Sequence, residues 1–364
     1  MILAAAPCLL ALVSTAAADQ INAEYRDLVG RYARGERGPA VAGLARFSDA
    51  ERTRAAQAAE GAARAAERGT AVAPPFPLRA AAMLHIDLDE AEWPAWAGQE
   101  QPTRCPGKQA AIAARYAALL AGHEETQGFA RRFFAALAHR CQWNACLPEA
   151  QRWAREGVKL FPRDAPLLLA AGSALEEAAT LWGGGSTVQR SHMSPAYREA
   201  ARTAAGQREG LYRQARGFFE DAIVADEGLA LARVHLGRVS WRLGERGAAQ
   251  AALEQAVARS TDRPLLYLAH LFLGRVHEDS DRLEEAVAHY RRSLALDPDA
   301  QAAAVALSHA LRLTDQVEES RAVLRHALAR AGRRTARDVY WDYLVANAVH
   351  GDELFAALRR ESLE

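Results

Sequence analysis

The second half of the chain repeats one pattern of apolar and polar positions. Its clearest unit starts at Tyr267 and reads YLAHLFLGRVHEDSDRLEEAVAHYRRSLALDPDA. Apolar residues recur at helical spacing in this unit, first before and then after a polar break at Asp279–Asp281. The second run ends at Asp297-Pro298, because proline cannot continue a helix interior. The pattern therefore predicts two antiparallel helices joined by a short turn.

The unit recurs along residues 131–364. Equivalent positions lie 34 residues apart in three pairs of units, at Leu137 and Ala171, Phe219 and Leu253, and Leu273 and Leu307. Gly237 and Gly274 also occupy equivalent positions, but they lie 37 residues apart. This larger offset predicts three extra residues near Arg263–Leu265.

These units resemble the tetratricopeptide repeat family, in which small residues lie midway along the first helix and early in the second, and a proline closes the unit. The resemblance rests on Leu236-Gly237, Ala249, Leu253 and Ala256 in one unit, on Leu273-Gly274, Ala286, Tyr290, Ser293 and Pro298 in the next, and on Leu137-Ala138, Ala150 and Phe161-Pro162 in an earlier one. It implies an all-α fold, a right-handed superhelix of antiparallel helix pairs. It also implies a non-catalytic scaffold that binds a partner protein or an extended peptide in a concave groove lined by the first helices.

Residues 19–130 show a weaker version of the pattern. Apolar spacing predicts helices over residues 21–32, 39–47, 48–68, 78–88 and 108–121, with proline-containing loops at 74–77 and 93–107. We interpret this segment as degenerate helical repeats or an N-terminal cap, because a stack of helix pairs needs an end that tolerates water.

Residues 182–207 interrupt the repeat. Three glycines follow Trp182, and the second helix of this unit arrives about 31 residues late. One interpretation is a flexible glycine hairpin followed by an extra helix from Pro195 to Gly206. The other is a lid or partner-binding loop, through which the protein would act as an accessory factor of the cell envelope. The candidate contact residues of that loop are Arg190, His192, Met193 and Tyr197.

The first eighteen residues differ from the rest of the chain. Met1–Val13 is an apolar run, and Ser14–Ala18 supplies small residues in an A-x-A arrangement before Asp19. This pattern predicts a secretory signal peptide in residues 1–18 and an exported protein, periplasmic or extracellular. The run is too short to span a bilayer, and no later stretch of about 18 apolar residues occurs, so the sequence predicts no membrane span.

Composition and motifs narrow the classes of function. The chain has 45 basic and 45 acidic residues and a formal net charge of zero, whereas a nucleic-acid binder normally carries a basic excess. The catalytic and phosphate-binding patterns G-x-S-x-G, H-E-x-x-H, G-x-x-x-x-G-K-[ST] and C-x-x-C do not occur. We therefore expect no catalysis, no cofactor and no nucleic-acid partner.

Three cysteines follow the predicted signal peptide. They are Cys105, Cys141 and Cys146, an odd number for an exported protein. One interpretation is a bridge from Cys105 to Cys141 or Cys146, as expected in an oxidising compartment. The others are free thiols, or a small-ligand or metal site formed by His139, Cys141 and Cys146.

The resemblance places a set of basic and aromatic residues on the groove face of the first helices. These candidate partner-binding residues are Arg238, Trp241, Arg242, Arg275, His309 and Arg312. Arg238, Arg275 and His309 fall in one row, which could bind a carboxylate or an extended peptide. The Lys and Asn residues of the carboxylate-clamp subtype are not matched, so its C-terminal peptide specificity is not implied. In the alternative interpretation, the basic side chains pair with Glu245, Glu278 or Asp279 in a solvated ion network.

Overall fold

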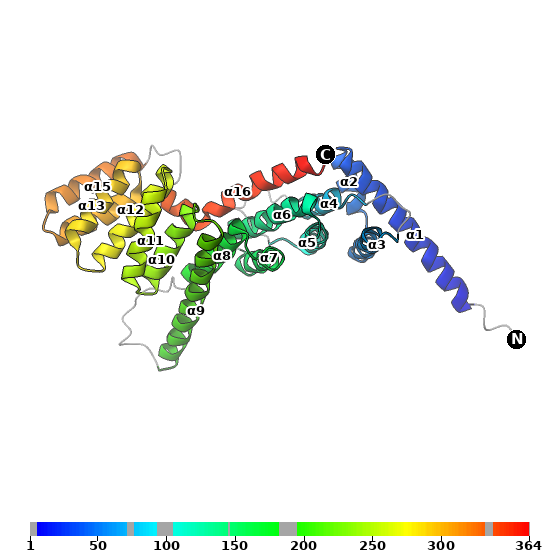
Figure 1. Cartoon of the computed structure of the whole chain (residues 1–364), viewed down its shortest axis with the longest axis horizontal. Helices are drawn as coiled ribbons and strands as arrows, with labels where there is room; N and C mark the ends of the chain where they lie inside the picture. The colour runs from blue at the N-terminus through cyan, green and yellow to red at the C-terminus, as the bar shows by residue number, and fades with distance from the viewer. Residues whose placement is uncertain are drawn as a thin grey trace. The chain divides into compact units, whose positions relative to one another are not determined.

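A computed structural model describes residues 6–70, 76–92, 105–144, 146–181, 195–331 and 338–363 of the chain. Within these ranges the secondary structure consists of helices, without a β-strand (Figure 1). None of the helices in the described ranges is both long and apolar enough to cross a membrane. The predicted all-α fold is confirmed.

The chain forms two compact units. The first unit contains Met1–Leu137, Asn144–Cys146 and Gly351–Glu364, and the second contains Ala138–Trp143 and Leu147–His350. Residues 351–364 thus belong to the first unit, whereas the repeat spacing predicts them at the end of the repeat array.

The first unit is built from helices. They are α1 (Ala6–Ala33), α2 (Arg37–Ala45), α3 (Asp49–Glu67), α4 (Leu78–Ala91), α5 (Lys108–Leu120), most of α6 (Glu124–Trp143) and the last turns of α16 (Val339–Glu361). Of these, α2, α3, α4 and α5 lie at nearly the predicted positions. A capping box begins α3: the Ser48 hydroxyl accepts from the Glu51 backbone N–H at 3.3 Å, and the Glu51 carboxylate accepts from the Ser48 N–H at 2.7 Å. The helix predicted from residue 21 starts earlier, because α1 also runs through residues 6–18.

A buried polar network crosses the core of the first unit. The Tyr25 hydroxyl lies 2.8 Å from His85 Nε2 and 2.8 Å from the Tyr116 hydroxyl, and His85 Nδ1 lies 2.8 Å from Gln109 Oε1. His85 is completely buried, and this burial lowers the pKa of its imidazole to about 4. The ring is therefore neutral at physiological pH and links α1, α4 and α5 through its two nitrogens.

The second unit is a stack of helix pairs in chain order (Figure 1). Its helices are the end of α6, α7 (Leu147–Leu160), α8 (Ala165–Leu181), α9 (Pro195–Ala225), α10 (Ala230–Arg242), α11 (Arg246–Arg259), α12 (Arg263–Glu278), α13 (Leu283–Leu296), α14 (Gln301–Leu313), α15 (Val317–Ala331) and the start of α16. Pairs form between α8 and α9, α10 and α11, α12 and α13, and α14 and α15. The predicted extra helix from Pro195 is present as the first part of α9. Residues 182–194, including Arg190, His192 and Met193, lie outside the described ranges.

Two glycines allow the paired helices to approach closely. A Cβ atom on Gly237 would overlap the side chain of Leu253, and one on Gly274 would overlap the ring of Tyr290. Both partners belong to the second helix of the pair, as the spacing predicts. Small residues therefore lie where the backbones come nearest to each other.

The predicted three-residue insertion lengthens one helix. α12 has 16 residues, whereas α10 and α14 have 13 each. The additional residues lie at the start of α12, where the Asp262 carboxylate accepts from the Leu265 N–H at 3.3 Å and Pro264 occupies the first turn. The three residues that change the repeat offset from 34 to 37 thus lie at the N-terminus of α12.

Candidate functional site

The start of α16 lies against the first helices of the array. The Tyr343 hydroxyl donates to Glu176 of α8 at 3.0 Å, and its ring stacks on His235 of α10 with centroids 4.6 Å apart. The Tyr340 ring lies 6.3 Å from that of Phe272 of α12. Part of the surface predicted to bind a partner is therefore covered by the chain itself.

A second anchor of α16 is Asp338, directly before its first turn. One carboxylate oxygen of Asp338 accepts from the Tyr267 hydroxyl of α12 at 2.9 Å, and the other accepts from the Ala302 N–H of α14 at 2.8 Å. Asp338 thus satisfies a backbone donor in the first turn of α14, where helix N–H groups lack partners within the helix.

Arg238 does not lie on an open groove surface, and this placement corrects its assignment as a partner-binding residue. It is 1% exposed, forms an ion pair with Glu176, and donates to the Thr180 hydroxyl at 3.3 Å. Its guanidinium lies over the Tyr343 ring at 5.3 Å. The cause of this burial is tertiary, because α8 and α16 both pack against this part of α10.

The ion pair keeps both charges in the interior. Burial alone would raise the pKa of Glu176, but Arg238 and His235 lower it below its usual value. Burial would lower the pKa of Arg238, and the Glu176 carboxylate raises it instead. Each charge therefore depends on its buried partner, so removal of either one would leave an uncompensated charge.

The other predicted residues lie nearer the surface. Trp241 Nε1 donates to Asp279 at 2.7 Å, and the Arg242 guanidinium lies over the Trp241 ring at 5.1 Å. Arg312 is exposed near the end of α14. These contacts fix the position of Trp241 at the end of α10 and leave its ring partly exposed.

Arg275 and His309 share one acidic partner. Glu278 lies 3.7 Å from Arg275 and accepts from His309 Nδ1 at 2.9 Å. The ion-network interpretation holds for this pair, whereas Glu245 contacts Arg216 at 2.6 Å. The structure thus gives two members of the predicted row a common partner, whereas Arg238 pairs with Glu176.

A cavity of about 310 Å³ lies beside these residues in the second unit. It is lined by Trp241, Leu271, Phe272, Arg275, Gln301, Ala302, Val305 and Tyr340. Leu271 and Phe272 are buried, Val305 is 56% exposed, and Arg275 is the one charged residue of this lining. The arrangement can accept an apolar group and place a carboxylate next to Arg275. Val305 and Tyr340 were not predicted, because their proximity depends on the position of α16.

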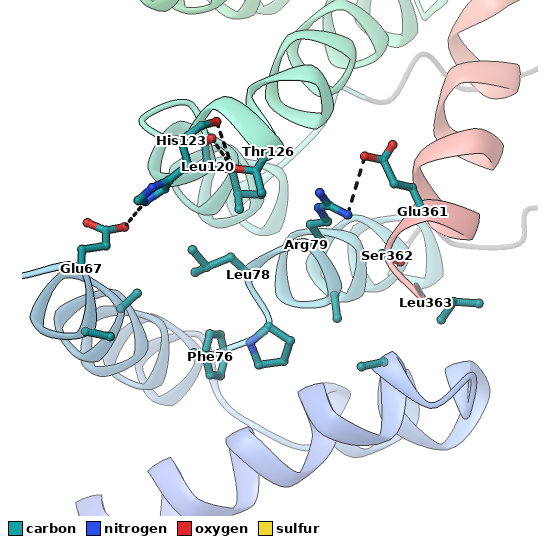
Figure 2. Close-up of a pocket in the computed structure, with 15 residues that line it drawn as sticks. Glu67, Phe76, Leu78, Arg79, Leu120, His123, Thr126, Glu361, Ser362 and Leu363 are labelled. Atoms are coloured by element: carbon teal, nitrogen blue, oxygen red, sulfur yellow. Dashed lines mark hydrogen bonds and ion pairs between the residues drawn. The ribbon is translucent and has the colours of Figure 1, made fainter. Parts of the chain in front are cut away.

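The first unit contains a larger cavity, of about 750 Å³, that sequence reasoning missed (Figure 2). Its lining combines apolar residues with two polar pairs and consists of Ala33, Ala63, Ala66, Glu67, Phe76, Pro77, Leu78, Arg79, Ala80, Leu120, His123, Thr126, Glu361, Ser362 and Leu363. Figure 2 shows the Glu67–His123 pair, at 3.2 Å, and the Arg79–Glu361 pair, at 3.9 Å, on two sides of Leu78. Because these charged groups pair with each other, the cavity mainly offers apolar surface.

The cysteines resolve the alternatives left open by the sequence. Cys105 and Cys146 form a disulfide across 41 residues, and Cys141 is a buried thiol. A disulfide sulfur is not a thiolate ligand, so the suggested metal site of His139, Cys141 and Cys146 lacks one of its three ligands.

The comparisons with known proteins identify the repeat. The tetratricopeptide repeat family model matches residues 234–303, from α10 to the start of α14. Solved structures to which this chain is similar include a MamA fragment from Desulfovibrio magneticus RS-1, 18% identical with a TM-score of 0.41, covering 57% of this chain and 97% of that one. Pseudomonas aeruginosa PilF is 13% identical with a TM-score of 0.43 and covers 63% of this chain and 88% of that one. YrrB, described as a tetratricopeptide repeat protein with an unusual peptide-binding site, is 16% identical with a TM-score of 0.36. The match covers 61% of this chain and 91% of that one. No curated protein sequence matches this chain significantly. Residues 234–303, within the stacked helix pairs of the second unit, thus match the tetratricopeptide repeat family.

Proposed function

We propose that this protein is a non-catalytic scaffold that binds an extended segment of a partner protein in the cavity beside α16. The observation that carries the proposal is an apolar cavity with one exposed guanidinium, on the first helices of the tetratricopeptide repeats. The bound segment presents an apolar side chain next to a carboxylate.

The shape and lining of the cavity support an apolar anchor. Its volume of about 310 Å³ is at the small end of the range of ligand pockets, about 300–1,000 Å³, and suits one large side chain. Leu271 and Phe272 form a buried apolar base, and Trp241 and Tyr340 supply aromatic surface. Aromatic residues around a desolvated pocket are typical of the energetic centre of protein interfaces.

The charge distribution supports an acidic neighbour for that anchor. The Arg275 side chain is 40% exposed, and its contact with Glu278 is long, at 3.7 Å. Glu278 also accepts closer hydrogen bonds from Tyr290, at 2.6 Å, and from His309, at 2.9 Å. The guanidinium of Arg275 can therefore turn to a partner carboxylate, with which arginine forms paired hydrogen bonds.

A selection from a random peptide library tests this proposal. The wild-type protein is expected to enrich peptides with a large apolar residue beside Asp or Glu. Two substitutions should each weaken the affinity for a selected peptide by about tenfold or more. Val305→Arg fills the mouth of the cavity, and Arg275→Ala removes a charge-assisted contact. Arg325→Ala, on an exposed position of α15, is the control. Equal affinity of all four proteins, with equal helicity by circular dichroism, would show that the cavity is not the binding site.

We also propose that the protein is exported. The leader-like residues 1–18 motivate this, and the Cys105–Cys146 disulfide supports it because disulfides persist in oxidising compartments. Intact-mass and peptide analysis of protein from the envelope fraction should find a processed N-terminus at Asp19 and the bridged cysteine pair. Protein that stays in the cytosol with Met1 attached and both thiols reduced would refute export.

A further inference from the structure

The larger cavity, of about 750 Å³, has no part in the proposed peptide site (Figure 2). All of its lining residues belong to the first unit, whereas the cavity beside α16 is lined by residues of the second. Its volume falls in the upper part of the usual range for ligand pockets, about 300–1,000 Å³. The cavity is therefore large enough for a small organic molecule.

Small and apolar side chains from several helix ends line this cavity. Ala33 ends α1, and Ala63 and Ala66 lie in the last two turns of α3. Leu120 ends α5, and Leu363, which is 49% exposed, follows α16. Apolar surface from separate elements thus remains in contact with water, and a ligand that covers it gains hydrophobic free energy.

The lining is aliphatic except for two rings. Phe76 is its one phenyl ring, and it already lies 6.1 Å from the rings of Tyr25 and Tyr116. The other ring is the imidazole of His123, which is hydrogen-bonded to Glu67. A flat aromatic ligand would therefore find little ring surface for stacking, whereas a flexible aliphatic chain can follow the uneven surface.

Arg79 supplies a cation with unused hydrogen-bonding capacity. Its guanidinium lies 3.9 Å from Glu361 and donates to the Glu125 backbone carbonyl at 3.3 Å, and both contacts are long. An arginine has five N–H donors. Glu361 has a closer cation in Arg132, which is outside the lining. Arg79 can therefore turn to a ligand without leaving Glu361 unpaired.

The position of Arg79 determines where an acidic group would lie. Figure 2 shows Arg79 on one side of Leu78 and the Glu67–His123 pair on the other. Glu67 lies 3.2 Å from His123 Nε2 and so already has a hydrogen-bond partner. A carboxylate at Arg79 would form paired, charge-assisted hydrogen bonds and lie across Leu78 from Glu67. Charge complementarity thus favours an anionic head group at Arg79 with an apolar chain along Leu78.

We propose that this cavity binds a free fatty acid of medium chain length. Its carboxylate pairs with Arg79, and its aliphatic chain packs against Leu78, Phe76 and the alanines of α1 and α3.

Calorimetric titration of the full-length protein with decanoate, below the concentration at which it forms micelles, tests this. The wild type should bind one equivalent. Decanol has the same chain without a charge and decylammonium has the opposite charge, so each should bind about tenfold more weakly or worse. Decanol or decylammonium binding as tightly as decanoate would show that Arg79 does not select the head group, and would overturn the proposal.

Substitutions locate the site. Arg79→Gln should weaken decanoate binding by about tenfold or more and leave decanol binding unchanged, because only the charge is lost. Ala66→Phe should weaken both, because it fills the cavity. Arg26→Gln, on an exposed position of α1, is the matched control and should bind as the wild type does. Binding that is lost in Arg275→Ala but retained in Arg79→Gln would place decanoate beside α16 and overturn the proposal.

A second readout keeps the proposal falsifiable if a variant folds poorly. A photoreactive diazirine analogue of decanoate, irradiated with the wild type, should label lining residues such as Leu78 and Leu363, detected by peptide mass spectrometry. Excess decanoate should suppress this labelling. The proposal is overturned if the wild type binds no decanoate, or if the label is found only outside the first-unit cavity.

Discussion

At the scale of single residues, Glu177 of α8 is a buried carboxyl without a cation beside it in the described contacts. It is 7% exposed and accepts from Gln142 Nε2 at 3.4 Å. Gln142 Oε1, in the same place, is buried with no hydrogen-bond partner among the described groups. Burial raises the pKa of Glu177 to about 8. The folded state therefore favours the protonated carboxyl, whereas the unfolded state ionises near the usual glutamate value.

Glu177→Gln is expected to stabilise the second unit, with the larger effect at alkaline pH. Because the folded pKa lies above the unfolded one, the wild-type free energy of unfolding falls as pH rises from about 4.5 to 8. A glutamine is neutral at every pH and brings an N–H donor for Gln142 Oε1. We expect a gain of about 1–3 kcal/mol at pH 8.5 and a smaller one at pH 5, measured by urea unfolding.

Glu318→Gln is the control for this change, because the Glu318 side chain is 81% exposed. It should alter the stability of the second unit by less than about 0.5 kcal/mol at both pH values. A Glu177→Gln protein that is less stable than the wild type at pH 8.5 would mean that the ionised carboxyl is accommodated in the folded state.

His85 gives the first unit a pH dependence of the opposite sign. Its folded pKa of about 4 lies below the unfolded value of about 6.5, so the unfolded state binds more protons between these values. The free energy of unfolding should therefore fall by up to about 3 kcal/mol as pH decreases from 6.5 to 4.

The measurement is urea unfolding of the first unit at pH 7 and pH 4.5. His85→Gln should be less stable at pH 7, because it disturbs the contacts with Tyr25 and Gln109, but should lose less stability on acidification. His123→Asn removes an exposed histidine and should behave as the wild type does. An unchanged acid sensitivity in His85→Gln would assign the effect to other groups.

At the scale of the helix pair, the close approach at Gly274 is the most sensitive point. A Cβ there would overlap Tyr290, which is completely buried and donates to Glu278 at 2.6 Å, so its ring has little room to move. Gly274→Ala should therefore destabilise the second unit by about 1–3 kcal/mol through overpacking, although alanine favours helices.

Gly247→Ala is the matched control on α11, where an added Cβ meets no atom within 4 Å. This substitution should be neutral or stabilise the unit by up to about 1 kcal/mol, because alanine loses less backbone entropy than glycine in a helix. Thermal unfolding of the two variants measures the change in stability that each substitution causes. If both behave alike, helix propensity rather than packing controls these positions.

At the scale of the whole molecule, the Cys105–Cys146 disulfide links two parts of the first unit that are distant in the sequence. It closes a loop of 41 residues and thereby restricts the unfolded chain. Reduction should lower the free energy of unfolding of the first unit by about 3–4 kcal/mol. Urea unfolding with and without dithiothreitol measures this, and Cys105→Ser should reproduce the reduced state and be insensitive to the reductant. A reductant effect that persists in Cys105→Ser would show that a disulfide other than Cys105–Cys146 is present.

The sequence alone was sufficient to predict the helix pairs, the three-residue extension near Arg263 and the close approach of paired helices at Gly237 and Gly274. These features depend on residues that are neighbours within a helix or within one helix hairpin. Apolar periodicity and side-chain size in the sequence therefore predict them directly. The first-unit helices were predictable to within a few residues at most ends for the same reason, although α1 starts fifteen residues before the predicted Ile21.

Only the tertiary structure decided which surfaces are available. Arg238 is buried because Glu176 and Tyr343 contact it. Glu176 lies 62 residues before Arg238 and Tyr343 more than a hundred residues after it, so no periodic pattern connects these positions. The partner of Cys105 and both cavities depend in the same way on segments distant in the sequence. Periodicity reports which side of a helix is apolar, but the burial of a charge depends on which other segments fold against it.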